Sequence, residues 1–189
     1  MDKTVVLAKK GGARVLHSAL KSPAHQRNTG ARKAKGDILL FLDADVRIGD
    51  HAIVEEVFCA LRDHVGAIAR SDIIFSERTW IDRLMFMMTN AVALIGPRWC
   101  GRGAFLAVRK KEFERVGGFD ERRFVSEDVD LFRRIAKVGA VTCLRARIEE
   151  SPRRQRRLGY PRVLASWISN AVWACFTGNS HDKEWVAIR

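Results

Sequence analysis

Hydrophobic and polar positions alternate along this chain as helical and strand-like segments, without a repeat or a low-complexity tract. A Ser22-Pro23 start and a Gly36 stop predict a helix between them. The five consecutive apolar residues 38–42 then predict a strand that is covered on both faces, as in the interior of a parallel sheet. This order predicts an α/β fold, with a mostly parallel sheet flanked by helices.

The segment after this strand has helical periodicity. From Asp50 to Arg62, apolar residues recur at the spacing of one helix face, which we expect to pack on the sheet. These residues are Ile53, Val54, Val57, Phe58 and Leu61.

Composition and charge narrow the class of protein. The 189 residues, 47% of them hydrophobic, suffice for one globular domain with a core. The net charge of +12 indicates an anionic partner, which could be nucleic acid, a membrane surface or a phosphorylated small molecule. No RNA-binding aromatic motif or zinc-finger spacing supports nucleic acid, so we expect none.

Neither the cysteines nor the N-terminus indicates export. The four cysteines form no CxxC or Cys/His cluster, and we interpret them as reduced thiols in the core. The first twelve residues hold no apolar stretch of signal-peptide length, so we expect a cytoplasmic protein.

Two carboxylates, Asp43 and Asp45, follow the apolar strand directly. Ligands of open α/β sheets bind outside the carboxyl ends of strands, where this DxD motif lies. Mg²⁺ or Mn²⁺ would neutralise the pair and would keep coordination positions for substrate phosphates. The alternative is that the two acids only start a turn and cap the next helix.

A second acidic cluster begins another predicted helix. Ser126 is its expected N-cap, and Glu127, Asp128 and Asp130 fall in the first turn. The helix dipole would keep an acid there ionised near neutrality, so Asp128 is our candidate general base, with Glu127 beside it. Alternatively, these acids only complement the dipole.

Glycines and a basic residue separate the two acidic clusters. Gly101 and Gly103 flank Arg102 before a strand-like run. Glycines let a backbone approach a ligand closely, and Arg102 could meet a phosphate or a sugar hydroxyl; a plain turn is the alternative. Gly117-Gly118 predicts the end of the next helix.

The order and spacing of three segments resemble the family 2 glycosyltransferases of the GT-A fold. QRNTGARKAKGDILLFLDADV is similar to the segment that leads into their DxD, GRGAFLAVRKKEFERVGGFDE to their acceptor loop, and SEDVDLFRRIAKVG to their ED motif. The resemblance covers most of the chain. It implies transfer of a sugar, with inversion, from a nucleotide-diphosphate donor.

The same resemblance implies roles for single residues. Asp43 and Asp45 would bind the metal that holds the donor diphosphate, Asp45 more directly, and Asp128 would deprotonate the acceptor hydroxyl. Arg102, or an arginine from SPRRQRRLGY, would supplement the metal charge near the diphosphate. Gly101, Gly103 and Ala104 would line the acceptor site.

Two departures from the family pattern follow. Gln155 does not begin the family's Q-x-x-R-W motif, because no tryptophan follows in place, and this argues against a processive synthase. Arg153, Arg154, Arg156 and Arg157 are then candidate phosphate or lipid-headgroup contacts, or a solvated basic loop. TVVLAKKGGARVL is similar to the end of the family's second helix and its third strand. We therefore expect a GT-A-like domain over residues 1–160 that is incomplete at its N-terminus and leaves an exposed sheet edge.

Two apolar segments bear on the acceptor. Residues 80–99 and 163–180 are helical in pattern but do not read as membrane spans. In the C-terminal part, 161–189, Trp167 and Trp173 with nearby arginines suit a helix at a membrane interface, and a polyprenyl-phosphate acceptor would then fit. Amphipathic helices that only cover the sheet are the alternative. His181 is a remote metal-ligand candidate.

Competing functions come from other classes. A haloacid-dehalogenase-like phosphatase also has a DxD after an apolar strand, but Arg47 stands where such enzymes have Thr or Val. A catalytically impaired fragment could act as a basic module that binds anions or membranes by charge alone. Metal-dependent binding of nucleotide diphosphates would separate an enzyme from such a module.

Overall fold

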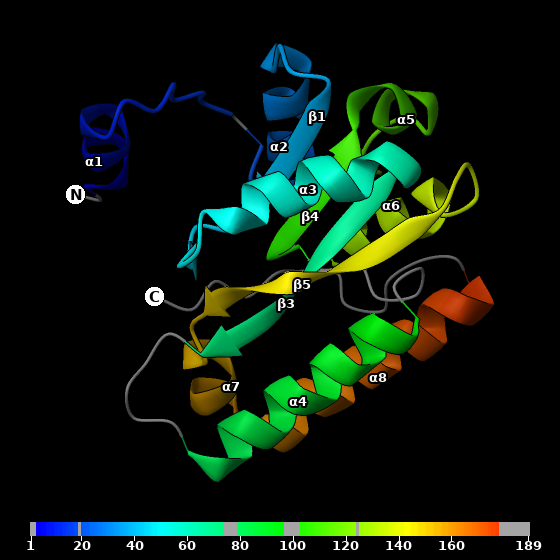
Figure 1. Cartoon of the computed structure of the whole chain (residues 1–189). Helices are drawn as coiled ribbons and strands as arrows, with labels where there is room; N and C mark the ends of the chain where they lie inside the picture. Colours follow the sequence, from blue (N-terminus) through cyan, green and yellow to red (C-terminus); the bar gives the residue numbers. More distant parts are fainter. Residues whose placement is uncertain (1–2, 19, 74–78, 97–102, 124, 178–189) are drawn as a thin grey trace.

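A computed structural model describes residues 3–18, 20–73, 79–96, 103–123 and 125–177, the last seven of these by their backbone. The described residues form a five-stranded sheet with helices on both faces (Figure 1). In spatial order the strands are β1 (Ile38–Leu42), β4 (Phe105–Arg109), β3 (Gly66–Ile73), β5 (Val141–Glu150) and β2 (Val46–Arg47).

Eight helices are described. They are α1 (Thr4–Lys10), α2 (Pro23–Lys33), α3 (Ala52–Asp63), α4 (Trp80–Ile95), α5 (Lys110–Arg115), α6 (Glu127–Ile135), α7 (Arg153–Leu158) and α8 (Tyr160–Thr177).

The α/β class is confirmed, but the expected mostly parallel sheet is wrong. β4 runs antiparallel to both β1 and β3, and β2 runs antiparallel to β5. Among the described strands, β3 and β5 form the parallel pair. An uninterrupted apolar run indicates that a strand is buried, and it carries no information about the direction of its neighbours.

β1 has the predicted bounds, but the prediction that both of its faces are covered is wrong. Leu39 and Phe41 are buried, whereas Leu40 and Leu42 are 38% and 43% exposed. Because β1 lies at one end of the sheet, one of its edges is left without a strand neighbour in the described structure. The exposed sheet edge that we expected is therefore found at this strand.

The N-terminal segment follows its prediction in part. The expected helix is α1, which has no buried residue and lies at the side of the molecule (Figure 1). The strand expected after it does not form: the described residues 13–18 have no sheet assignment. A strand needs a hydrogen-bonding partner, and this segment is not paired with β1.

Two apolar clusters lie on opposite faces of the sheet because side chains alternate along each strand. Leu106 and Val108 of β4 face the cluster beneath α2, α5 and α6, while Phe105 and Ala107 face the cluster beneath α3. In α3 the buried stripe is narrower than predicted, since Val54 and Phe58 are exposed.

Local sequence signals account for several helix ends. The Ser22 side chain accepts a hydrogen bond from the His25 backbone N–H at 3.4 Å and so caps α2 as predicted. This helix ends at Lys33, short of Gly36. After α5, Gly117 and Gly118 have φ of 81° and 69°, so the predicted glycine stop is confirmed.

The C-terminal helices lie together with α4 in Figure 1. The basic run after β5, considered as a loop or a binding segment, forms the short helix α7. In the part of the chain that the structure describes, no helix has the length and apolar character needed to cross a membrane.

Candidate active site

The DxD motif lies where β1 ends and β4 begins. The two strands are antiparallel, so the residues after β1 lie beside those before β4. The Asp43 N–H donates to the Ala104 carbonyl at 3.4 Å, which continues the strand pairing by one step. Ala104, predicted to line the acceptor site, thus contacts the first DxD residue through its backbone.

The predicted ED motif starts α6 beside this point. Glu127 is buried, and the Gly103 N–H donates to Asp128 Oδ2 at 2.5 Å. The other carboxylate oxygen of Asp128 accepts from the Val129 N–H at 2.8 Å. The backbone of Gly103, a residue expected to line the acceptor site, therefore contacts the proposed base directly.

Ser126 holds the N-cap position but does not cap α6 with its side chain. Its φ of 60° places it in the left-handed region, which non-glycine residues seldom adopt. The expected capping bond is absent for this reason. Such backbone strain clusters at functional sites, and here it lies one residue before the two acids.

Arg27 of α2 joins the two acidic clusters. Its guanidinium donates through Nη2 to Asp43 Oδ1 at 2.6 Å and through Nη1 to Glu127 Oε1 at 2.5 Å. Its carbon Cζ lies 5.4 Å from the centre of the Phe119 ring. The DxD and the ED motif lie more than eighty residues apart in the chain, and both therefore contact the guanidinium group of Arg27.

The sequence interpretation assigned no role to Arg27, although a signal was present. Ala24, Arg27, Asn28 and Ala31 recur at the i, i+3, i+4, i+7 spacing of one helix face. Ala24, Asn28 and Ala31 are buried, and the Arg27 side chain is 16% exposed. An arginine on the inner face of a helix needs carboxylate partners, and the two acidic clusters supply them.

A side chain at residue 103 would crowd Arg27 and Asp128. A Cβ there would lie 2.9 Å from Arg27 Nη2 and 3.1 Å from Asp128 Oδ2. Close approach to these two side chains therefore favours glycine at residue 103, whereas the expectation for the glycines of this segment was close approach to a ligand.

Burial dominates the electrostatics of the two acids. It raises the pKa of Glu127 to about 7, with repulsion from Asp128 adding to the rise and Arg27 opposing it. Burial also raises the pKa of Asp128, against Arg27 and the two backbone N–H donors. Desolvation therefore opposes the ionisation that we expected the helix dipole and the free N–H groups to favour at this helix start.

Asp45 is the more solvent-exposed carboxylate of the DxD. Its side chain is 57% exposed, against 41% for Asp43, and the nearest basic atom recorded for it is Arg153 Nη2, at 3.9 Å. Within the described residues, no three His, Cys, Asp or Glu side chains gather as a metal site. Two half-exposed carboxylates fit Mg²⁺ or Mn²⁺, which commonly take one or two protein carboxylates and complete their shell with water and substrate phosphates.

Several predicted site residues lie outside the described part of the chain. These are Gly101, Arg102 and His181. The basic candidates Arg153, Arg154 and Arg157 all lie on α7, and Arg153 is the one for which a DxD contact is given.

The comparison with protein families decides between the classes considered above. The family described as "Glycosyl transferase family 2" matches residues 1–136. The chain belongs to glycosyltransferase family 2. The matched range includes both acidic clusters and Arg27, and the phosphatase alternative is excluded by this membership.

A named relative matches this chain at low sequence identity. The pre-mycofactocin glycosyltransferase of Mycobacterium tuberculosis is 28% identical over 138 residues, which are 66% of this chain and 28% of that protein. This family 2 chain thus spans just over a quarter of that relative's length.

Solved structures confirm the GT-A fold. A mannosyltransferase from Pyrobaculum calidifontis, in complex with GDP-Man and Mn²⁺, superposes with a TM-score of 0.63 at 19% identity, over 89% of this chain and 52% of that one. Glucosyl-3-phosphoglycerate synthase from M. tuberculosis, in complex with phosphoglyceric acid, gives 0.59 at 15% identity, over 92% of this chain and 65% of that one.

Proposed function

We propose that this family 2 chain forms the catalytic part of a glycosyltransferase that moves a sugar from a nucleotide-diphosphate donor to an acceptor hydroxyl with inversion. The observation that carries this proposal is the joining of Asp43 and Glu127 by Arg27, at 2.6 and 2.5 Å. It brings the carboxylates proposed for the donor next to the acid pair proposed for the acceptor.

The DxD carboxylates would hold the divalent cation. Asp43 and Asp45 would bind Mg²⁺ or Mn²⁺, which would offset the charge that develops on the leaving diphosphate. The Pyrobaculum mannosyltransferase was solved with GDP-Man and Mn²⁺, and the mycobacterial synthase with UDP and Mn²⁺. A nucleotide-sugar donor and a divalent metal are thus established for structures of the same fold.

Asp128 would act as the general base. The acceptor oxygen forms a bond to the anomeric carbon, the bond from that carbon to the diphosphate oxygen breaks, and the acceptor proton passes to Asp128. The Gly103 N–H on Oδ2 and the Val129 N–H on Oδ1 fix the carboxylate plane. Arg27 would keep enough positive charge beside the acid pair for Asp128 to lose its proton.

Two substitutions test the donor and base roles separately. GDP-mannose and UDP-glucose with Mn²⁺ serve as donor probes in a thermal-shift measurement and in a donor-hydrolysis assay. We expect Asp45→Asn to abolish the metal-dependent stabilisation, and Asp128→Asn to keep it while losing turnover by roughly two or more orders of magnitude. Asp63→Asn, at the exposed end of α3, is the matched control.

Two results would contradict the proposal. One is donor stabilisation that does not depend on Mn²⁺ in the wild-type chain. The other is normal turnover in Asp128→Asn.

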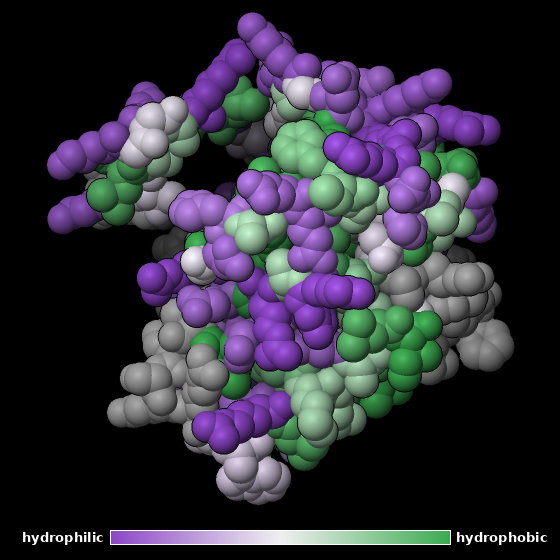
Figure 2. All heavy atoms as spheres, viewed as in Figure 1, coloured by the Kyte–Doolittle hydropathy of each residue, from purple (hydrophilic) through white to green (hydrophobic). Residues whose placement is uncertain are grey.

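Peripheral membrane contact is a second candidate, favoured by the surface of α4. Trp80, Leu84, Met88, Val92 and Ile95 recur at helical spacing and are 43–88% exposed. Figure 2 shows hydrophobic side chains gathered over the end of α4. Trp167 of α8 is also exposed, at 42%. Such a face suits a helix pair in the plane of a lipid interface.

Vesicle co-sedimentation tests this candidate. We expect Met88→Ser/Ile95→Ser to reduce binding to phosphatidylcholine–phosphatidylglycerol vesicles, while the control Val54→Ser/Phe58→Ser on α3 leaves it unchanged. A basic module acting by charge alone would bind equally with either pair of substitutions and would dissociate as salt rises.

A further inference from the structure

The turn after α5, formed by residues 116–119, is held between the two helices that carry the candidate active site. On one side this 116–119 turn is hydrogen-bonded to α2, the helix that carries Arg27. On the other side it is hydrogen-bonded to α6, the helix that begins with Glu127 and Asp128. The turn therefore connects the helix of the cation with the helix of the acids that the cation meets.

Asn28 holds the 116–119 turn from the α2 side. Its Oδ1 accepts from the Phe119 N–H at 2.9 Å, and its Nδ2 donates to the Phe119 carbonyl at 2.9 Å. The same Nδ2 donates to Glu121 Oε1 at 2.8 Å. One amide thus binds the main chain of Phe119 in both directions, as a residue of a neighbouring strand would. Because Asn28 is buried, removing its side chain would leave these backbone groups without a replacement partner.

Arg134 holds the same turn from the α6 side. Its Nη1 donates to the carbonyls of Val116 and Gly118, at 2.7 and 2.8 Å. Its Nε and Nη2 donate to Asp130 Oδ2, one helical turn earlier in α6, at 2.9 and 2.6 Å. Because the guanidinium is a rigid planar fork, the bonds to Asp130 also fix the direction of the bonds to the turn.

Phe119 carries the position of the turn to Arg27. Its buried ring lies edge-on to Phe41 of β1 and to Phe113 of α5, with ring centres 5.0 and 5.7 Å apart. Arg27 Cζ lies 5.4 Å from the centre of the Phe119 ring, within the range of a cation–π contact. Since Asn28 fixes its main chain and two aromatic rings fix its side chain, Phe119 gives the guanidinium a rigid surface to lie on.

We propose that Asn28 and Arg134 are positioning residues, which hold Arg27 between the two acidic clusters by clamping the 116–119 turn and with it Phe119. A buried ion pair offsets its desolvation only when its geometry is good, so a small displacement of Arg27 weakens its bonds to both carboxylates. The consequence for sugar transfer rests on the proposed function; the placement of Arg27 does not.

Hydrogen exchange of the Arg27 guanidinium, followed by heteronuclear NMR of the full chain, tests this placement without an activity assay. Guanidinium protons that are bonded to Asp43 and Glu127 exchange slowly with water, and Arg27→Gln identifies their signals. We expect Asn28→Ala to reduce this protection by roughly tenfold or more, because the guanidinium is released from its bonds more often. Arg134→Lys, which keeps the charge of α6 but not the fork, should have the same effect.

Val57→Ala is the matched control. It removes buried apolar contacts beneath α3, on the opposite face of the sheet, and leaves α2, α6 and the 116–119 turn unchanged. Urea unfolding measures the stability that each variant loses, and we expect the control to keep the Arg27 protection. An equal loss of protection in the control would overturn the proposal, as would unchanged protection in either positioning variant. If Asn28→Ala does not fold, the milder Arg134→Lys decides.

Kinetics separate this proposal from the proposed function. In the donor-hydrolysis assay with Mn²⁺ and UDP-glucose or GDP-mannose, we expect both positioning variants to lower kcat/KM by roughly tenfold or more, and the control to leave it unchanged. Loss of Arg27 protection in a chain whose wild type shows no hydrolysis would support the positioning role and contradict the proposed function. Unchanged protection alongside an active wild type would contradict the positioning role alone.

Discussion

At the scale of single residues, the candidate site depends on one charge placed between acids. Arg27 reaches Asp43 and Glu127 with different nitrogens, and its pKa is raised because these carboxylates outweigh its burial. Glu127 and Asp128 are adjacent in sequence and both largely removed from water. Without a cation beside them, one of the two would have to be protonated.

Removing this charge is therefore expected to destabilise the fold and the site together. For Arg27→Gln we predict a loss of about 3 kcal/mol in the free energy of unfolding, measured with urea, because a buried ion pair is broken on one side. Arg32→Gln is the control on the same helix, with a side chain that is 60% exposed. Similar stabilities for the two variants would contradict a central role for Arg27.

The raised pKa of Glu127 makes stability depend on pH in a defined direction. Its pKa is about 7 when folded and 4.5 in an unperturbed chain, so the folded state binds more protons between these values. The free energy of unfolding should fall as pH rises through this window, by on the order of 3 kcal/mol from this group. Asp128, also raised, contributes with the same sign.

Urea unfolding from pH 5 to pH 8 measures this dependence. We expect a shallower slope in Glu127→Gln than in the wild type, and an unchanged slope in Glu55→Gln, an exposed acid of α3. Acids with lowered pKa, such as Asp120, titrate below this window and do not disturb it. A wild-type stability that rises with pH over this range would refute the assignment.

Two glycines offer a matched pair of substitutions. Gly103→Ala would bring a Cβ to 2.9 Å from Arg27 Nη2, whereas a Cβ at Gly30 meets nothing within 4 Å. We predict that Gly103→Ala destabilises the fold by about 1–3 kcal/mol and lowers transfer. Gly30→Ala, inside α2, should stabilise it by about 1 kcal/mol. Thermal unfolding of both variants gives the comparison, and equal melting temperatures would contradict the crowding at residue 103.

At the scale of elements, the sequence predicted whether a segment forms a helix or a strand better than it predicted which segments pair with one another. The bounds of β1 and the start of α2 follow from an apolar run and a Ser-Pro signal, both of which act locally. The antiparallel pairing of β4 with β1 joins residues 63 to 71 positions apart, from Leu42↔Phe105 to Ile38↔Arg109, which no local pattern encodes. The same limit applies to Arg27, whose partners lie on two other elements.

Asp82 determines how the last two helices are joined to the fold. Its carboxylate accepts from Arg156 of α7 and Tyr160 of α8, and these bonds hold its pKa below the usual range despite burial. We predict that Asp82→Asn costs about 2–3 kcal/mol, because charge-assisted bonds to a buried group are lost. Limited proteolysis should then cleave between α7 and α8 first. Asp72→Asn is the control, an acid of β3 whose side chain is 35% exposed.

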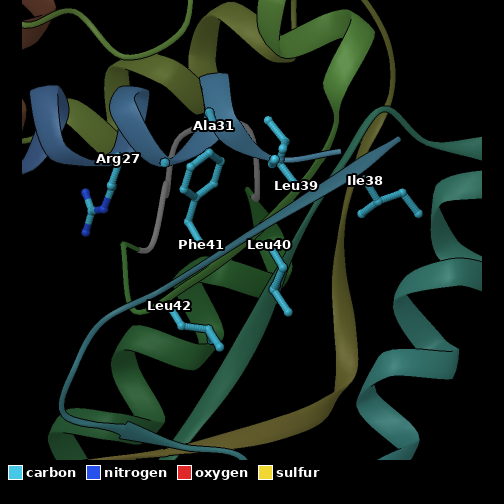
Figure 3. Close-up of a pocket in the computed structure, with 9 residues that line it drawn as sticks. Arg27, Ala31, Ile38, Leu39, Leu40, Phe41 and Leu42 are labelled. Atoms are coloured by element: carbon cyan, nitrogen blue, oxygen red, sulfur yellow. The ribbon is translucent and has the colours of Figure 1, made fainter. Parts of the chain in front are cut away.

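At the scale of the whole molecule, β1 lies at one end of the sheet, and its outer edge has no strand neighbour among the described residues. A hollow of about 360 Å³ runs between this strand and α2, lined by Gly30, Ala31 and Ala34 and by the strand itself (Figure 3). None of the five strand residues is charged, and charge is a common protection of sheet edges. The net charge of +12 opposes contact between two copies, and salt screens that repulsion.

Association through this edge should therefore increase with salt and be blocked by one lysine. In an antiparallel pairing of two β1 strands, side chains of one face lie opposite each other, and like charges there are destabilising. We predict that light scattering of the wild-type chain rises between low and high salt, and that Leu40→Lys suppresses the rise. Val54→Lys adds the same charge to α3 at similar exposure, 43% against 38%, and should leave the association intact. If both variants suppress it equally, added net charge and not the strand edge controls association.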